Sequence, residues 1–142
     1  MISLISIILE IGYLNIIRPD SYLLPLFTLV SLIFLKKDNH YFIKCFLIGI
    51  LYDLVFTNLF IINGILYLFI GFIIKRINNS IIKNIITGIL IIFLYQLLLF
   101  ILFNISKYQI YSLNEFIYIL PKYFIINIIY ILIISIFKHK YY

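Results

Sequence analysis

Two acidic residues, Glu10 and Asp53, could do chemistry within segments that otherwise have the composition of membrane helices. Asp53 lies in the apolar run GILYDLVFTN, from Gly49 to Asn58. A carboxylate inside a bilayer is costly, so it marks a functional or interaction site. Two interpretations are open: a hydrogen-bonded aspartate that locks helices together, or a group that handles a ligand or a proton.

Helical spacing places small and polar residues on the face that carries Asp53. Steps of four residues bring together Cys45, Gly49, Asp53 and Thr57. A glycine one turn from the aspartate lets a neighbouring helix approach closely, which favours packing or a partner interface over ligand handling. Lys122 and Arg18 are possible cationic partners for the Asp53 carboxylate.

Catalysis is not indicated. Glu10 continues a polar stripe that is best explained as inward-facing, and it is formed by Ser3, Ser6, Glu10 and Tyr13. No second carboxylate has the spacing of a general acid–base pair. The sequence also lacks a glycine-rich phosphate loop, a nucleophile elbow and a His/Cys cluster with metal-ligand spacing. We expect no enzyme, no cofactor and no metal site, and a single cysteine excludes an internal disulfide.

Composition assigns the chain to the membrane. Of its 142 residues, 65% are hydrophobic and 11% are charged, whereas a soluble domain is roughly half apolar and a quarter charged. Residues 1–17 lack the basic start and the cleavage site of a signal peptide, so we expect a retained first span. We relate the net charge of +6 to membrane topology and expect no nucleic-acid partner.

Six apolar segments predict an all-α membrane protein that forms a single integral membrane domain over residues 1–142. The expected spans are 2–17, 21–35, 41–57, 59–75, 81–103 and 116–137. A full span takes about 20 helical residues, so the first four are short. Five spans with one re-entrant piece is therefore the competing arrangement.

The basic residues favour six spans with both termini in the cytoplasm. In that topology eight basic residues lie on the inner side: Lys36, Lys37, Lys44, Lys75, Arg76, Lys83, Lys138 and Lys140. Three lie on the outer side: Arg18, Lys107 and Lys122. A five-span chain would place Lys138 and Lys140 outside, which the positive-inside rule disfavours.

The order of these features resembles the rod shape-determining protein MreD family. IIRPD is followed by a short span, a basic loop, FLIGILYDLVFTN and a glycine-bearing span that ends in KR. The positions that match family elements are Arg18, Pro19, Asp20, Gly49, Tyr52, Asp53 and Thr57. The resemblance implies that these residues bind a partner or lock helices.

The resemblance further implies a multi-pass protein of the bacterial inner membrane that is not an enzyme. Its role would be that of a scaffold in the cell-elongation (rod) complex, supporting lateral peptidoglycan synthesis and cell shape. The direct partners would be an MreC-like bitopic membrane protein and the lipid bilayer. MreB, RodA and a class B penicillin-binding protein would be indirect partners.

The fold of the family is similar to the substrate-binding components of energy-coupling-factor transporters. This likeness supports an alternative, a substrate-binding membrane subunit of a vitamin transporter. The outer ends of the spans offer polar groups for such a pocket: Arg18, Asp20, Asp53 and Glu115.

Overall fold

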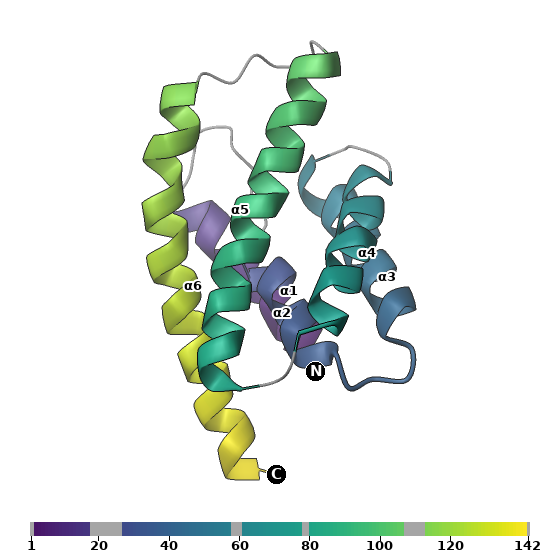
Figure 1. The fold of residues 1–142 in the computed structure, drawn as a ribbon, viewed down its shortest axis with the longest axis vertical. Helices are drawn as coiled ribbons and strands as arrows, with labels where there is room; N and C mark the ends of the chain where they lie inside the picture. The colour runs from purple at the N-terminus through teal and green to yellow at the C-terminus, as the bar shows by residue number, and fades with distance from the viewer. Residues whose placement is uncertain (1, 18–26, 58–60, 78–79, 107–112, 142) are drawn as a thin grey trace. The chain divides into compact units, whose positions relative to one another are not determined.

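The computed structural model describes residues 2–17, 27–57, 61–77, 80–106 and 113–141. Within these ranges the chain forms six α-helices and one π-helical turn, and no strand (Figure 1). The predicted all-α class and the number of helices are therefore confirmed. The chain divides into two compact units, Met1–Asn79 and Ser80–Tyr142, which are described separately.

The first unit contains two pairs of helices that are consecutive in the chain. Its elements are α1 (Ile2–Ile17), α2 (Phe27–Leu35), α3 (Tyr41–Tyr52), the π-helical turn η1 (Asp53–Thr57) and α4 (Ile62–Lys75). Helix α1 packs against α2 and α3 packs against α4, while α2 also contacts α3 and α4. The centre of this unit is aromatic and aliphatic, with Tyr41, Tyr52, Tyr67 and Leu29 fully buried.

The second unit is a pair of long helices, α5 (Ile81–Ser106) and α6 (Leu113–Tyr141), which pack against each other. Residues Ile82–Leu102 of α5 have a mean hydropathy of 2.8 over 21 residues. Among the described residues, this is the one helix that is both long and apolar enough to cross a membrane by itself. Shorter apolar helical stretches are Ile62–Lys75 and Tyr123–Ile136.

The helix boundaries differ from the predicted segments at several ends. The segment predicted at 41–57 is α-helical only to Tyr52, after which the backbone widens into η1. The next helix begins at Ile62 rather than residue 59, following a left-handed Ile61 with a φ of 76°. The last two helices extend beyond their apolar segments, and residues 21–26 of the second predicted span lie outside the described ranges.

Polar side chains lie inside the first unit and apolar side chains lie on its surface. Its buried polar and charged residues are Ser6, Glu10, Thr28, Ser31, Asp53 and Asn63. Its exposed residues include large hydrophobic side chains at helical spacing on α3 (Ile43, Leu47, Leu51) and on α4 (Ile65, Phe69, Phe72). A water-soluble domain avoids large exposed apolar stripes, whereas a helix in lipid turns its polar residues inward.

Candidate functional site

Asp53 lies where α3 passes into η1, and its carboxylate faces the beginning of α4. The side chain is 1% exposed. Its Oδ2 accepts a hydrogen bond of 2.8 Å from the backbone N–H of Asn63, and its Oδ1 accepts one of 2.5 Å from the Asn63 side-chain amide. Both carboxylate oxygens are therefore bonded to one residue in the first turn of α4.

This contact supplies the cap that the sequence at the start of α4 lacks. The N-cap residue is Ile61, which has no side-chain oxygen to bond the first backbone N–H groups. The first N–H groups of a helix have no partner within the helix, and its N-terminus carries a partial positive charge. The Asp53 carboxylate satisfies one of these donors and places negative charge beside that end, so one helix caps the next.

Gly49 makes the short distance between α3 and α4 possible. A Cβ atom at this position would lie 2.7 Å from the carbonyl carbon of Asn63 and 2.7 Å from the Cα of Gly64, and closer still to the Asn63 carbonyl oxygen. Real Cβ atoms do not come this close to backbone atoms, so only glycine fits here without a shift of one helix. Gly49 and Asp53 therefore act together, the first through close packing and the second through hydrogen bonds.

Two further close contacts between α3 and α4 lie towards the other end of the helix pair. A Cβ atom at Gly64 would lie 3.0 Å from Ile50, and one at Gly71 would lie 2.9 Å from the Sγ of Cys45. The free thiol of Cys45 is fully buried. Small residues on both helices thus allow close approach over several turns, which is how helices associate in lipid.

Aromatic residues connect this site to α2. The ring of Tyr52 lies beside Phe56 and Tyr67, with centroid distances of 4.9 and 6.2 Å. The hydroxyl of Tyr67 forms a hydrogen bond of 2.7 Å with Thr28 Oγ1 on α2. The family-like tyrosine beside Asp53 therefore belongs to a buried contact that joins α2, α3 and α4.

Glu10 makes a second cap of the same kind between α1 and α2. Its side chain is fully buried, and its Oε2 accepts backbone hydrogen bonds of 2.8 Å from Phe27 and 2.9 Å from Thr28. These two N–H groups are in the first turn of α2 as the structure describes it. The polar stripe on the first helix was predicted to face inward, and the structure gives its acid a defined role.

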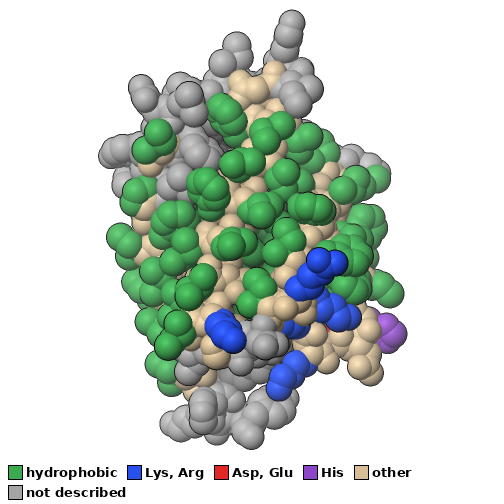
Figure 2. Space-filling model, viewed as in Figure 1, with side chains coloured by type: hydrophobic (Ala, Val, Ile, Leu, Met, Phe, Trp, Pro, Cys, Tyr) green, Lys and Arg blue, Asp and Glu red, His purple; other side chains and the backbone are tan. Residues whose placement is uncertain are grey.

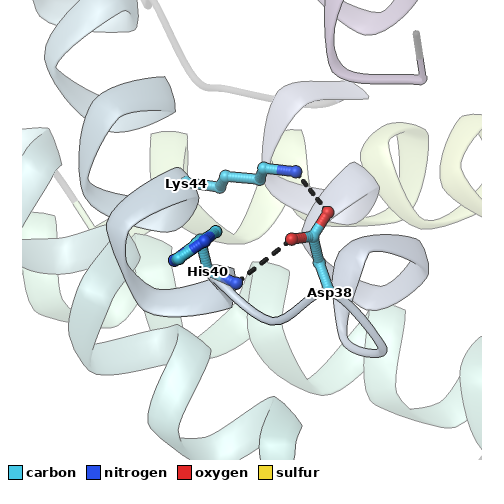
Figure 3. A network of polar contacts seen from close by, with 3 residues as sticks. All are labelled: Asp38, His40 and Lys44. Carbon is cyan, nitrogen blue, oxygen red and sulfur yellow. Dashed lines mark hydrogen bonds and ion pairs between the residues drawn. The ribbon is translucent and has the colours of Figure 1, made fainter.

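A third acid, Asp38, lies at the polar turn before α3 (Figure 3). Its Oδ1 accepts a hydrogen bond of 3.1 Å from the backbone N–H of His40, the N-cap residue, and its Oδ2 pairs with the Lys44 ammonium. The bond from Lys44, followed by that from His40, holds the pKa of the Asp38 carboxyl below its usual range. Each of the three acids whose side chains the structure describes therefore serves the start of a helix.

The structure brings together three of the seven predicted site residues: Gly49, Tyr52 and Asp53. Thr57 ends η1, and its side chain is not described. The predictions at Arg18, Pro19 and Asp20 lie outside the described residues.

Sequence reasoning missed Asn63, which bonds Asp53. It considered cationic partners for this carboxylate, and the cue to an amide partner was the Asn63-Gly64 pair at the first turn of the next apolar segment. Within the described part of the chain, no three His, Cys, Asp or Glu side chains gather as a metal site.

A comparison with known families identifies the whole chain. The model of the rod shape-determining protein MreD family matches residues 1–142. The chain belongs to the MreD family. This family is a membrane component of the shape-determining system, so the predicted family and a role in rod shape determination are confirmed. Neither a curated protein nor a solved structure gives a significant match.

Proposed function

We propose that this chain is a membrane scaffold subunit of the rod complex that supports lateral peptidoglycan synthesis by holding the membrane helix of an MreC-like bitopic protein. MreB, RodA and a class B penicillin-binding protein are its indirect partners. The protein acts by presenting a surface and carries out no reaction itself. Membership of the MreD family supports the role in cell shape.

The observation that carries the scaffold proposal is the capped, close-packed α3–α4 pair. The Asp53–Asn63 hydrogen bonds and the Gly49 contact fix the position of α4 on α3. The outer sides of both helices carry exposed apolar side chains, among them Leu47 at 51% and Ile65 at 61%. In lipid, two helices associate through shape and hydrogen bonds, so a rigid pair offers a partner helix a defined surface.

We further propose that the chain forms a single domain of six spans in the bacterial inner membrane, with both termini in the cytoplasm. The distribution of basic residues supports this orientation. Figure 2 shows Lys and Arg side chains gathered near the lower ends of α3 and α4, below a surface of apolar side chains. These ends correspond to the proposed cytoplasmic side.

The alternative of a vitamin-binding transporter subunit loses one of its supporting residues. Asp53 was one of four polar groups available to line an outer pocket, and both of its oxygens bond Asn63. The engagement of Asp53 within the helix pair therefore favours the scaffold over a ligand pocket.

Co-purification with the MreC-like protein of the same bacterium tests the scaffold. Leu47→Trp enlarges an exposed side chain on α3, and Ile86→Trp enlarges one on α5 that is 58% exposed. We expect Leu47→Trp to lower the recovered partner by at least ~5-fold, as for the loss of one important interface contact, and Ile86→Trp to lower it by less than ~2-fold.

Cell shape provides the second measurement in the same strains. Cells that depend on the Leu47→Trp variant should become round, whereas cells with Ile86→Trp should stay rod-shaped. Equal recovery of the partner with both variants would place the interface elsewhere. If the unaltered chain does not recover the MreC-like protein, the scaffold proposal is wrong.

A further inference from the structure

The C-terminal half of α4 lines an open groove, and the charged residue in its described lining is an arginine. The groove has a volume of about 400 Å³ and is lined by Phe69, Phe72, Ile73, Arg76 and Ile77. These positions recur every three or four residues and so lie on one face of the helix. We call this feature the α4 groove. Its volume falls in the range of small-molecule sites in proteins.

The apolar wall of the groove is held in place by an aromatic stack. Phe72 stacks on Phe42 of α3 with a centroid distance of 4.4 Å and an interplanar angle of 29°. The ammonium of Lys75 lies over the other part of this stack, 4.6 Å from the Phe42 centroid. Lys75 is thereby directed to Phe42, and the cation that lines the groove is Arg76.

Arg76 is the C-cap residue of α4, at the proposed cytoplasmic end of the span. It is exposed, and among the described residues it forms no ion pair with a carboxylate. A guanidinium group presents a planar fork of N–H donors that fits phosphate oxygens in a bidentate manner. The groove therefore combines a phosphate-binding group at its end with aromatic and aliphatic side chains along its length.

This combination matches the chemistry of one class of ligand. We propose that the α4 groove binds an anionic glycerophospholipid, with its phosphate at Arg76 and the upper part of an acyl chain along Phe69 and Phe72. Basic pockets on the cytoplasmic side of membrane helices recognise anionic lipid headgroups. The surroundings favour an anion, because the same end of the unit carries Lys36, Lys37, Lys44 and Lys75 and one acid, Asp38, that is already paired with Lys44.

Native mass spectrometry of the full chain in a non-ionic detergent tests the proposal. The protein is titrated with phosphatidylglycerol or with phosphatidylcholine of the same acyl chains. We expect phosphatidylglycerol to be retained preferentially at one site. Equal retention of the two lipids would overturn the proposal, because the groove would then be an ordinary lipid contact.

Two matched pairs of variants locate the site. Arg76→Gln should weaken phosphatidylglycerol binding by at least ~5-fold, the factor that corresponds to about 1 kcal/mol for one basic residue. Lys37→Gln removes the same charge from an exposed residue that does not line the groove and should weaken it by less than ~2-fold. Equal losses would indicate diffuse attraction to the basic end and would contradict a site.

The apolar half of the groove has its own control. Phe69→Ala shortens a lining residue, whereas Ile65→Ala shortens an exposed residue one turn away on the same helix that does not line the groove. The first should lower affinity for long-chain phosphatidylglycerol, and the second should leave it unchanged. If Phe69→Ala leaves lipid affinity unchanged while Arg76→Gln lowers it, the groove holds only the headgroup and the acyl-chain assignment is wrong.

Discussion

The two capped helix pairs of the first unit use the same device with different chemistry. The Oε2 atom of Glu10 on α1 accepts hydrogen bonds from two successive backbone N–H groups of α2, those of Phe27 and Thr28. Asp53 caps α4 with both oxygens, one bonded to the backbone N–H and one to the side-chain amide of Asn63. A long acid reaches its target by itself, whereas a short acid needs the two helices to be closer together.

The glycines of the two pairs follow this difference. Among the described residues, nothing lies within 4 Å of the place where a Cβ atom would be at Gly12 on α1, two residues after Glu10. Gly49 on α3 has the backbone of Asn63 and Gly64 at that place. The comparison indicates that the α3–α4 pair depends on close backbone packing, while the α1–α2 pair depends on the reach of its acid.

The largest expected effect is the contrast between alanine at these two glycines. Gly49→Ala should destabilise the protein by about 3 kcal/mol, because α3 and α4 must separate to admit the methyl group. Gly12→Ala should be neutral or stabilising by up to ~1 kcal/mol, since alanine is the better helix former. Unfolding in detergent can be followed with a thiol-reactive dye, because Cys45 is the one cysteine of the chain and is fully buried. Equal effects of the two substitutions would contradict the comparison.

A second contrast lies in the amides that replace the two acids. Asp53→Asn keeps one acceptor oxygen but turns an NH₂ group towards the donors of Asn63, so it should cost about 2 kcal/mol. Glu10→Gln keeps an acceptor oxygen that the backbone N–H groups of Phe27 and Thr28 can both bond, so it should cost less than Asp53→Asn. The same dye assay measures both. A larger loss for Glu10→Gln than for Asp53→Asn would contradict this difference between the two caps.

The hydrogen bond that joins the two helix pairs should contribute less to stability than either cap. Thr28→Val and Tyr67→Phe each remove one member of the hydrogen bond that joins α2 to α4, and each should cost about 1 kcal/mol. Because the two changes break the same bond, the double variant should cost clearly less than the sum of the single variants. Additive losses in thermal unfolding would show that the hydroxyl groups do not depend on each other.

The smallest effect concerns the partly buried Asp38 at the turn before α3. Its folded-state pKa is lowered, so the stability that it contributes is present above its ordinary pKa of 3.8 and is lost as the pH falls through the lower, folded-state value. Asp38→Asn should lower the melting temperature slightly near neutral pH and make the fall of the melting temperature in acid correspondingly smaller. If the melting temperature of the Asp38→Asn protein falls in acid as much as that of the unaltered chain, other groups cause the acid dependence.

The sequence allowed the fold class, the number of helices and the family to be predicted, because long apolar runs and short polar breaks leave few alternatives. It also selected Gly49 and Asp53 together from their spacing. The partner of Asp53 could not be predicted, because a carboxylate in an apolar segment was expected to pair with a cationic side chain, Arg18 or Lys122. An uncapped helix N-terminus attracts a carboxylate as well, but it becomes visible only when the helix is known to begin at Ile62.

The cap made by Glu10 was hidden for the same reason. The residues that it bonds, Phe27 and Thr28, lie inside the apolar segment predicted at 21–35, and nothing in their side chains indicates a helix start. The change from α-helix to π-helix at Asp53 also has no simple sequence signal. The turn begins at the residue that bonds Asn63, and this contact between helices is not part of local propensity.

The most direct test of the account is a double-mutant cycle between Asp53 and Asn63. Asp53→Ala, Asn63→Ala and the double variant are compared with the unaltered chain in free energy of unfolding and in recovery of the MreC-like partner. The account predicts a coupling energy of about 1–2 kcal/mol and reduced partner recovery with each single variant. A coupling energy near zero, together with unchanged partner recovery, would contradict the claim that this cap holds α3 and α4 as a scaffold.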